Sequence, residues 1–382
     1  MEDSFIVDAV RTPRARRKGK FSSVHPIDLL TYPLNAIVQR NNIKPESIED
    51  VAIGCVTQTG EQGWCVARGA ILAAGWPISV PGTTINRLCA SSQQAVGFIS
   101  SSIKSGQYEL AIAGGLEHMT RAPMFSDIGG EESPLLKKHH PNLVQQGMAA
   151  ELLAKKYEIA RSECDLFALK SQQRAKVAIE GGFFKKSIIP VPYTDQDRSS
   201  QIMEIDDNPR FDTNLEALST LKTPFSEEGV ITAGNASGIV DGASAILLAS
   251  KSALAEFNLK PRAKVVTHAT VGSDPLIMLD GPVAASRAIL KRAGLGIEDI
   301  DLWEINEAFA PVPILAIRAL GIDPEKVNVC GGAIALGHPL GATGAILIGS
   351  ALDELERRAA KRALITMCIG LGMACATIIE RI

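Results

Sequence analysis

One cysteine stands where the sequence predicts the end of a strand and the start of a helix. A short β-like run ends at Ile85, Cys89 follows, and Ala95, Ile99 and Ile103 recur at the spacing of one helix face. Free N–H groups and the dipole at a helix N-terminus favour a thiolate. Small neighbouring side chains leave room for a substrate. A reactive cysteine and a buried structural one are both open interpretations of this stretch.

The C-terminal third adds polar residues that could serve such a cysteine. His338 lies in the glycine-rich stretch GGAIALGHPLGATGA, residues 331–345, and Pro339 keeps that loop from extending as a strand. An imidazole there could accept the proton of Cys89, although a lone histidine is usually structural. Asn306, in the motif NEAFA after a predicted strand, can orient a water or bind an oxyanion. Asparagine is also common in turns, which is the alternative.

A second cysteine ends another predicted strand. Cys368 opens the loop CIGLGM, residues 368–373, whose glycines leave backbone N–H groups free for a ligand oxygen. A strand follows the GLG pattern, so it is only weak evidence for a nucleotide-binding turn. A cysteine–histidine pair performs acyl transfer through a thioester. A further thiol is useful where a proton must also leave or reach carbon. We interpret Cys330 and Cys375 as structural.

Bulk composition sets the class of protein. The chain has 382 residues, of which 46% are hydrophobic and 21% charged, with a formal net charge of −3. A large core is feasible, and no general basic excess predicts nucleic-acid binding. The basic residues between Arg11 and Lys20 are interpreted as a solvated loop, with phosphate contact as the alternative. The seven cysteines form no C-x-x-C pair, which indicates a reducing compartment. We expect a cytoplasmic protein, or one imported without a long cleaved presequence, with no membrane span, no secretory signal and no metal site.

The order of predicted elements indicates an α/β fold in three parts. Strands and helices alternate in the first and last thirds of the chain. The segment between them is richer in proline, histidine and charge, and it contains one clear helical stretch over residues 147–180. We therefore predict an N-terminal core half (1–115), a loop domain inserted into the core (116–247) and a C-terminal core half (248–382).

The two core halves resemble copies of one β/α unit. The tripeptide IED at 48–50 precedes one predicted strand, and IED at 297–299 precedes another, 249 residues later. The same offset carries Cys89 onto His338, and each of these residues precedes a helix and then a strand. Ligands of such sheets bind at the carboxyl ends of strands near a junction. We therefore expect one shared site with one residue from each copy.

Together these stretches resemble the thiolase family. The matching motifs in the core are NRLCASSQQAV, NEAFA, GGAIALGHPLGATGA and CIGLGM, and those in the insertion are TAGNASGIVDGAS, GMAAELLAKKY and FALKSQQRA. They span nearly the whole chain in the order of the family. The resemblance implies two duplicated βαβ-type halves packed as a layered core, plus a loop domain that binds coenzyme A.

The resemblance also implies a role for each site residue. Cys89 would be acylated, His338 would activate it, and Cys368 would exchange the proton at the acetyl α-carbon. One oxyanion hole would comprise His338 and a water held by Asn306. A second would comprise the backbone N–H groups of Cys89 and Gly370. The residues that would line the coenzyme A or acyl site are Ser237, Met148, Met278 and Phe309.

The implied function is thiolytic cleavage of a 3-ketoacyl-CoA to acetyl-CoA and a shortened acyl-CoA, as in β-oxidation, with Claisen condensation as the reverse reaction. The alternative is a biosynthetic acetoacetyl-CoA thiolase, although GGLEHMT at 114–120 is closer to degradative members. A ketosynthase would carry histidine in place of Cys368, and a non-catalytic CoA- or lipid-binding relative would lack one of the three reactive residues. Coenzyme A is expected as a substrate, with no resident cofactor. A homodimer or homotetramer and a β-oxidation partner enzyme are further expectations.

The chain departs from the family pattern at four positions. Leu371 and Ala374 replace glycines, Cys330 replaces an asparagine, and Ile346 replaces an arginine. We expect Leu371 and Ala374 to narrow the acyl pocket, whereas the changes at Cys330 and Ile346 leave the catalytic set intact.

Overall fold

Strands from both core halves pair into one mixed, ten-stranded sheet in the computed structural model, which describes residues 2–131 and 133–382. They are β1 (Phe5–Arg11), β2 (Ala15–Arg16), β3 (Asp50–Gly54), β4 (Thr83–Ile85), β5 (Leu110–His118), β8 (Val240–Ala249), β9 (Ala263–Gly272), β10 (Leu302–Ile305), β11 (Arg362–Ile369) and β12 (Met373–Arg381). Their order across the sheet is β10-β11-β12-β9-β1-β8-β5-β3-β4, and β2 pairs with β8. The predicted α/β class is confirmed.

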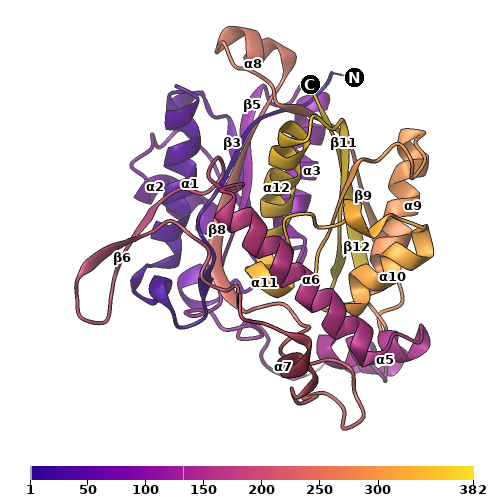
Figure 1. Ribbon diagram of the computed structural model, residues 1–382. Coiled ribbons are helices and arrows are strands. Elements are labelled where there is room, and N and C mark those ends of the chain that lie inside the picture. The colour runs from indigo at the N-terminus through magenta and orange to yellow at the C-terminus, as the bar shows by residue number, and fades with distance from the viewer. Residues whose placement is uncertain (1, 132) are drawn as a thin grey trace.

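Two helices pack side by side between the strands of the two halves. They are α3 (Ser91–Lys104) and α12 (Thr343–Arg357), at the centre of Figure 1. α3 is buried on most of its surface, and so is α12, because strands from both halves enclose them. This burial explains why both helices carry so many small or apolar residues.

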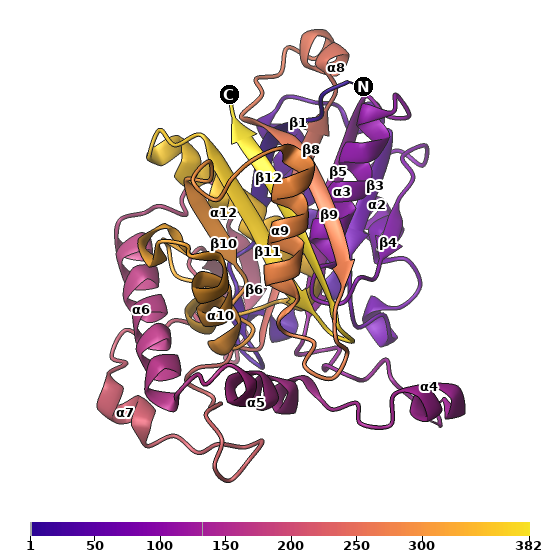
Figure 2. The ribbon, with the colours of Figure 1, turned by 90° about the vertical axis from the view of Figure 1, so that its right-hand side faces the viewer.

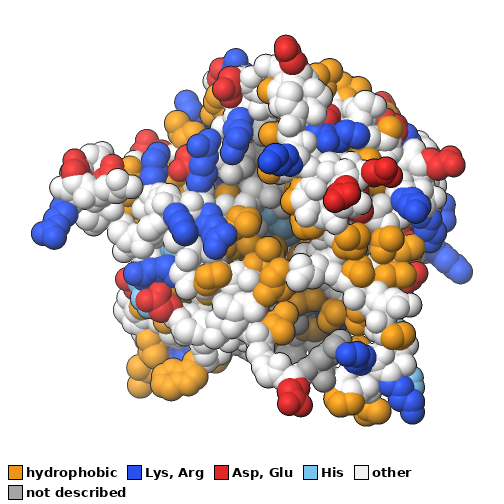
Figure 3. Space-filling view, turned by 90° about the horizontal axis from the view of Figure 1, so that it is seen from below, with side chains coloured by type: hydrophobic (Ala, Val, Ile, Leu, Met, Phe, Trp, Pro, Cys, Tyr) orange, Lys and Arg blue, Asp and Glu red, His pale blue; other side chains and the backbone are white. Residues whose placement is uncertain are grey.

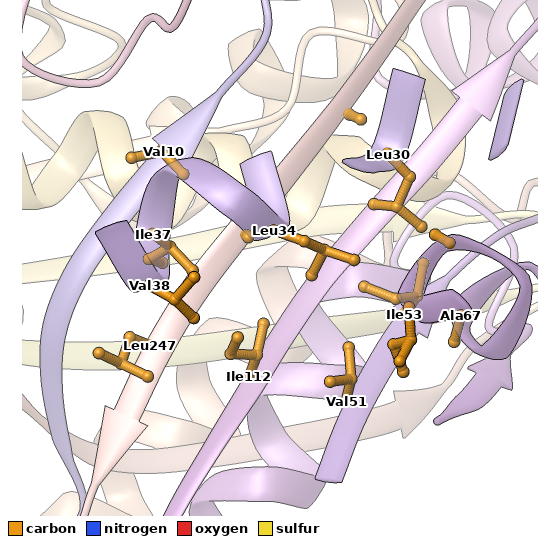
Figure 4. Packing of buried hydrophobic residues seen from close by; sticks show 14 of the residues in the cluster. Val10, Leu30, Leu34, Ile37, Val38, Val51, Ile53, Ala67, Ile112 and Leu247 are labelled. Carbon is orange, nitrogen blue, oxygen red and sulfur yellow. The ribbon is translucent and has the colours of Figure 1, made fainter. Parts of the chain in front are cut away.

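Other helices cover the outer faces of the sheet. α1 (Pro26–Arg40) and α2 (Val66–Ala73) cover the N-terminal strands. The apolar positions of α1 predict this packing, and Figure 4 shows Leu30, Leu34, Ile37 and Val38 above strand residues such as Ile112 and Leu247. On the opposite face, α9 (Gly281–Ala293) and α10 (Pro311–Leu320) cover the C-terminal strands (Figure 2). The two ends of the layered core are therefore built alike.

The strand order confirms the internal repeat. Outward from the β1–β9 seam, the sequence β1, β8, β5, β3 on one side matches β9, β12, β11, β10 on the other. The matched helices α3 and α12 begin at Ser91 and Thr343, which are 252 residues apart. The matched strands β5 and β11 begin at Leu110 and Arg362, again 252 apart. The predicted offset of 249 is thus wrong by three residues, and Cys89 corresponds to Gly341 rather than to His338.

The insertion folds into helices and short strands beside the core. It contains α4 (Pro134–His139), α5 (Gln146–Lys156), α6 (Arg161–Glu180), β6 (Val191–Thr194), β7 (Ser200–Met203) and α7 (Leu215–Ser219). The stretch 147–180, predicted as continuously helical, breaks between α5 and α6, where Glu158 takes a left-handed backbone conformation with φ +52°. Figure 2 shows α4 standing away from the body of the molecule.

The three-part division of the chain remains a prediction. β8 pairs with β1 and β5 of the N-terminal half, so this strand lies across the boundary placed between residues 247 and 248. The remaining short helices of the core are α8 (Lys251–Glu256) and α11 (Ala333–Leu336). No helix in the described parts of the chain combines the length and the apolar character that a membrane span requires.

Candidate active site

A cavity of about 520 Å³ lies where the two core halves and the insertion meet. Its walls include Cys89 from the N-terminal half, and His338, Cys368 and Gly370 from the C-terminal half. Ser237 and Phe309 also line it, and the ring of Phe225 from the insertion packs edge-on against Phe309, with centroids 6.4 Å apart. Met148 and Met278 do not line it; Met278 is packed in an apolar cluster.

Cys89 sits on a tight turn between β4 and α3. Leu88 takes a left-handed conformation with φ +46°, and its N–H donates to the side-chain oxygen of Asn86 over 2.8 Å. The hydroxyl of Ser91 accepts from the N–H of Arg87 over 2.9 Å. Beneath the turn, a Cβ on Gly54 would overlap the backbone of α3, so only glycine allows the helix start to lie this close to β3. The turn therefore fixes where the sulfur points.

The environment of the Cys89 sulfur holds two opposing influences. Burial raises the pKa of the Cys89 thiol to about 11, and hydrogen bonds from the Gly370 N–H, from its own N–H and from Gln146 lower it only in part. The N–H groups at the helix start favour the thiolate, as expected, but desolvation outweighs them in the resting protein. The backbone N–H groups of Cys89 and Gly370, which were predicted to form the second oxyanion hole, thus both lie within hydrogen-bond reach of this sulfur.

His338 is held in one tautomer by its neighbours. Its Nδ1 lies 2.6 Å from Thr343 Oγ1, and that hydroxyl donates to the carbonyl of Pro339 over 2.9 Å. Because its proton is used there, Thr343 Oγ1 accepts from Nδ1–H, which leaves the lone pair on Nε2. Burial, and to a smaller extent Arg14, lowers the pKa of His338 to about 3. The imidazole is therefore neutral and able to accept a proton on Nε2.

Asn306 lies beside that lone pair. Its Nδ2 is 3.3 Å from His338 Nε2, and its backbone N–H donates to the carbonyl of Thr366 over 3.0 Å. The side-chain oxygen of Asn306 is buried without a hydrogen-bond partner in the described chain. A buried, unsatisfied oxygen is a position for an ordered water. This geometry is compatible with the predicted water-mediated oxyanion hole.

Cys368 occupies the end of β11 and is only 1% exposed. Burial raises the pKa of its thiol well above the ordinary value, and the proximity of Cys89 raises it further. The two sulfurs therefore share one desolvated environment. Cys375 lies one register position away on β12, opposite Met367, and its thiol donates to Gln93 over 3.0 Å.

Glu117 is a buried residue of this region that sequence patterns do not identify. Its carboxylate accepts from the backbone N–H groups of Val56, Thr57 and Gly341 over 2.9–3.1 Å, and from the amide of Gln62 over 3.0 Å. Burial raises its pKa against these hydrogen bonds. Because Gly341 follows His338 by three residues, Glu117 ties the histidine loop to the N-terminal half.

Several other lining residues are not among the predicted site residues. The apolar ones include Met119, Met124, Ile239, Leu279 and Leu340, and the polar or basic ones include Gln146, Arg16, Arg17 and Arg210. Leu371 does not line the cavity, contrary to expectation, because its side chain is 59% exposed on the loop beyond Gly370. Cys330 is buried, as a structural cysteine should be. Within the described residues, no cluster of three or more His, Cys, Asp or Glu side chains could hold a metal.

Comparisons with known proteins agree with this geometry. Residues 4–252 match the family model for the thiolase N-terminal domain, and residues 259–381 match that for the thiolase C-terminal domain. The chain is 45% identical to a β-ketoadipyl-CoA thiolase of Pseudomonas aeruginosa, over 99% of each chain. Its structure is similar to human mitochondrial 3-ketoacyl-CoA thiolase, with a TM-score of 0.92, 38% identity and coverage of 100% and 99%. It is equally similar to Bacillus anthracis acetyl-CoA acetyltransferase, with a TM-score of 0.92, 36% identity and the same coverage. The chain therefore belongs to the thiolase family and is an acyltransferase.

Proposed function

We propose that the cavity cleaves 3-ketoacyl-CoA by two acyl transfers through Cys89. The observation that carries this proposal is the meeting of the Cys89 thiol, the unprotonated Nε2 of His338 and the Cys368 thiol in one buried cavity. A nucleophile, a base and a separate proton donor are what cleavage of a carbon–carbon bond next to a thioester requires. Coenzyme A serves as a substrate, and side chains of the protein move the protons.

In the first transfer, the Cys89 sulfur attacks the 3-keto carbon and His338 Nε2 accepts the thiol proton. The N–H groups of Cys89 and Gly370 stabilise the oxyanion. The bond between the α- and β-carbons then breaks, and its electron pair goes to the α-carbon, which takes a proton from Cys368. His338 and the water on Asn306 stabilise the enolate oxygen of the departing acetyl-CoA.

In the second transfer, free coenzyme A takes the acyl group. Its thiol gives a proton to the Cys368 thiolate and attacks the acyl carbon, and the Cys89 sulfur leaves and regains its proton from His338. Ser237 and Phe309 line the part of the cavity next to the insertion, which we propose as the pantetheine site. Met148 and Met278 lie outside the lining and are supporting residues at most.

Mass spectrometry tests the acyl intermediate. The protein is incubated with acetyl-CoA, quenched and digested, and we expect an acetyl group on Cys89. A Cys89→Ala variant is the control and should carry none. Stable acetylation of Cys55, Cys65 or Cys368 with none on Cys89 would overturn the proposal.

Biosynthetic condensation of two acetyl-CoA molecules is the second candidate function, since the same groups catalyse both directions. Cleavage rates across a series of 3-ketoacyl-CoA chain lengths separate the two candidates. A chain that acts only on acetoacetyl-CoA would favour the biosynthetic role.

We also propose a cytoplasmic homodimer or homotetramer. All seven cysteines are free, as in a reducing compartment. Trp64 is fully exposed and Ile78 is 84% exposed, and both belong to the segment between β3 and β4; β4 is an edge strand that pairs only with β3 among the described strands. Exposed large apolar side chains and an unpaired strand edge are each typical of a surface that a second copy covers. Light scattering of Trp64→Glu against the unmodified chain would test this surface, and pull-down with other β-oxidation enzymes would test for a partner.

A further inference from the structure

A buried carboxylate is connected to both of the loops that carry Cys89 and His338. Figure 3 shows the outer surface on the side seen from below, where basic side chains gather and hydrophobic side chains surround hollows between them. Glu117 is no part of that surface, because it stands near the end of β5 and is 0% exposed. A buried charge is costly unless neighbouring groups compensate it, so the partners of Glu117 show what it holds in place.

The four groups that bond to the Glu117 carboxylate are all hydrogen-bond donors. One oxygen accepts from the Thr57 N–H over 3.1 Å and from the amide nitrogen of Gln62 over 3.0 Å. The other accepts from the N–H groups of Val56 and Gly341 over 3.0 and 2.9 Å. A protonated carboxyl would need an acceptor for its O–H, and none of these four groups offers one. The side chain is therefore held as a carboxylate.

Gly341 connects this carboxylate to the histidine. It lies in the short 3-10 helix Leu340–Ala342, three residues after His338 and just before α12. This turn packs closely on the N-terminal half, since a Cβ on Gly115 of β5 would lie 2.2 Å from the Gly341 carbonyl oxygen. Side chains of the C-terminal half orient the imidazole ring, whereas Glu117 fixes the position of the whole loop against the N-terminal half.

Val56 connects the same carboxylate to the cysteine. Its N–H donates to Glu117, and its carbonyl accepts from the side-chain amide of Asn86 over 3.0 Å. The side-chain oxygen of Asn86 accepts in turn from the N–H of Leu88, which directly precedes Cys89. Short chains of hydrogen bonds therefore run from one carboxylate to both reactive loops.

The internal repeat contains a second copy of the proposed oxyanion hole. In the cavity, the backbone N–H groups of Cys89 and Gly370 form this hole. The offset of 252 residues between the two core halves matches them with the N–H groups of Gly341 and His118. The matching pairs occupy equivalent places in the fold, one group just before the central helix and the other at the end of the neighbouring strand.

Side chains of the protein occupy that second copy. The Gly341 N–H donates to Glu117, and the His118 N–H donates to the side-chain oxygen of Gln62 over 2.6 Å. A carboxylate oxygen carries the negative charge that an oxyanion would bring, so it suits the same arrangement of donors. One hole of the repeat is thus open to the cavity, and the other is closed by the chain itself.

We infer that Glu117 is a positioning residue, which fills the second copy of the oxyanion hole and thereby keeps the His338 loop aligned with the Cys89 turn. Its effect on catalysis rests on the proposed function. Proton transfer from Cys89 to His338 depends on their separation, and a displacement of about 1 Å can cost about 10²-fold in rate. If the carboxylate is removed, four donors lose their partner, so the vacated hole should accept a small free carboxylate.

Glu117→Ala empties the hole, and formate is the probe that refills it. We expect kcat for cleavage of acetoacetyl-CoA to fall about 10²-fold, with KM within about threefold. Formate should recover about tenfold of this loss, whereas potassium chloride at the same ionic strength should not. Formate should also raise the urea midpoint of Glu117→Ala but not that of the unmodified chain, because a ligand that binds only the folded state stabilises it.

Two further variants separate positioning from stability. Glu117→Gln keeps the volume but turns amide N–H groups towards the backbone donors, so it should lower kcat without any response to formate. Glu354→Gln makes the same change in a buried carboxylate of α12 that pairs with Arg357 and Arg358 over 2.6 and 2.9 Å and does not line the cavity. It should lower the urea midpoint and leave kcat within about twofold.

The outcomes distinguish the inference from the proposed function. No cleavage of acetoacetyl-CoA by the unmodified protein would contradict the proposed function, and the formate shift of the urea midpoint would still test the filled hole. An unchanged kcat in Glu117→Gln would overturn the inference, and this variant carries the test if Glu117→Ala does not fold. A folded Glu117→Ala that responds to formate in neither turnover nor urea midpoint would also overturn it, as would an equal loss of kcat in Glu354→Gln and Glu117→Gln.

Discussion

The two halves of the core hold their reactive residues in different ways. In the N-terminal half, Cys89 follows a turn of a few residues between β4 and α3. In the C-terminal half, the route to α12 is longer and buried, and it contains α11, His338 and a short 3-10 helix at Leu340–Ala342. The helices α3 and α12 match, yet Cys89 and His338 are not at matching positions. The repeat therefore supplies the framework, and the loops supply the chemistry.

The partners of the two residues differ in the same way. His338 is oriented by Thr343 and Asn306, both from its own half. The Cys89 thiol instead interacts with Gly370 of the other half and with Gln146 of the insertion. The orientation of His338 is thus fixed within one half of the core. The environment of Cys89 is complete only when the two halves and the insertion are assembled. Changes in either half should therefore affect the two residues differently.

Removing Cys368 should produce the largest change, because it removes a proton donor that the C-terminal half brings to Cys89. We expect Cys368→Ala to lower condensation, and hydrogen–deuterium exchange at the acetyl-CoA methyl, by about 10²–10⁴. Acetylation of Cys89 should persist at a reduced rate, as measured by mass spectrometry.

Cys375→Ala is the matched control for that variant, since Cys375 is also buried on the adjacent strand but does not line the cavity. It should keep methyl exchange close to the normal rate. Wild-type exchange in Cys368→Ala would assign the proton transfer to His338 or to the water on Asn306 instead.

A substitution at Thr343 tests whether His338 is oriented from within its own half of the core. Thr343→Val removes the acceptor for His338 Nδ1–H while keeping the shape of the side chain, so the imidazole loses its fixed tautomer and orientation. The loss of such a buried hydrogen bond corresponds to about 1–3 kcal/mol, or about fivefold to somewhat over a hundredfold in kcat, with a smaller change in KM. Thr343→Ser should recover most of the activity. Equal activity in the valine and serine variants would show that the tautomer is fixed by another group.

Sequence alone predicts the parts of this site that depend on local patterns. The strand–cysteine–helix order around Cys89 and the glycine loop around His338 are visible because each occupies one short stretch. Glu117 is not, since its partner Gly341 is 224 residues away. The break between α5 and α6 is missed because no glycine or proline marks the residues from Tyr157 to Ala160. A left-handed glutamate there ends the helix without a compositional signal.

The pKa shifts in the site also cannot be predicted from the sequence alone. A helix N-terminus predicts a lowered pKa for Cys89, but the depth of burial is a property of the assembled core and raises it. The prediction that Leu371 narrows the pocket is wrong for a similar reason, since a residue in a glycine loop can face either the cavity or the solvent. Both outcomes depend on contacts between distant segments.

The pH dependence of alkylation follows from the resting state of the pair. Since the pKa of Cys89 is raised to about 11 and that of His338 is lowered to about 3, both groups are neutral between these values. The rate of inactivation by iodoacetamide should therefore rise about tenfold per pH unit from pH 7 to 9, in step with the thiolate fraction. A plateau between pH 5 and 8 would instead indicate a resting thiolate–imidazolium pair.

The smallest effect concerns two leucines in left-handed conformations, one on each side of the site. Leu88 precedes Cys89 with φ +46°, and Leu371 follows Gly370 with φ +61°. Leu88 is partly buried and packs against the central apolar cluster, whereas Leu371 is 59% exposed. A left-handed conformation costs a leucine about 1 kcal/mol, and glycine avoids that cost.

Leu371→Gly should therefore stabilise the fold slightly, because it relieves strain and loses little buried surface. The extra entropy of glycine in the unfolded chain offsets part of this gain, so we expect a net increase of a few tenths to about 1 kcal/mol in the free energy of unfolding. Leu88→Gly relieves similar strain but also removes apolar packing, which contributes about 1 kcal/mol or more for a partly buried leucine, and it should destabilise. Urea unfolding of both variants measures the difference. If Leu371→Gly destabilised as much as Leu88→Gly, the exposed leucine would have to be making contacts in the folded protein, and a second copy covering this loop would be the first explanation to examine.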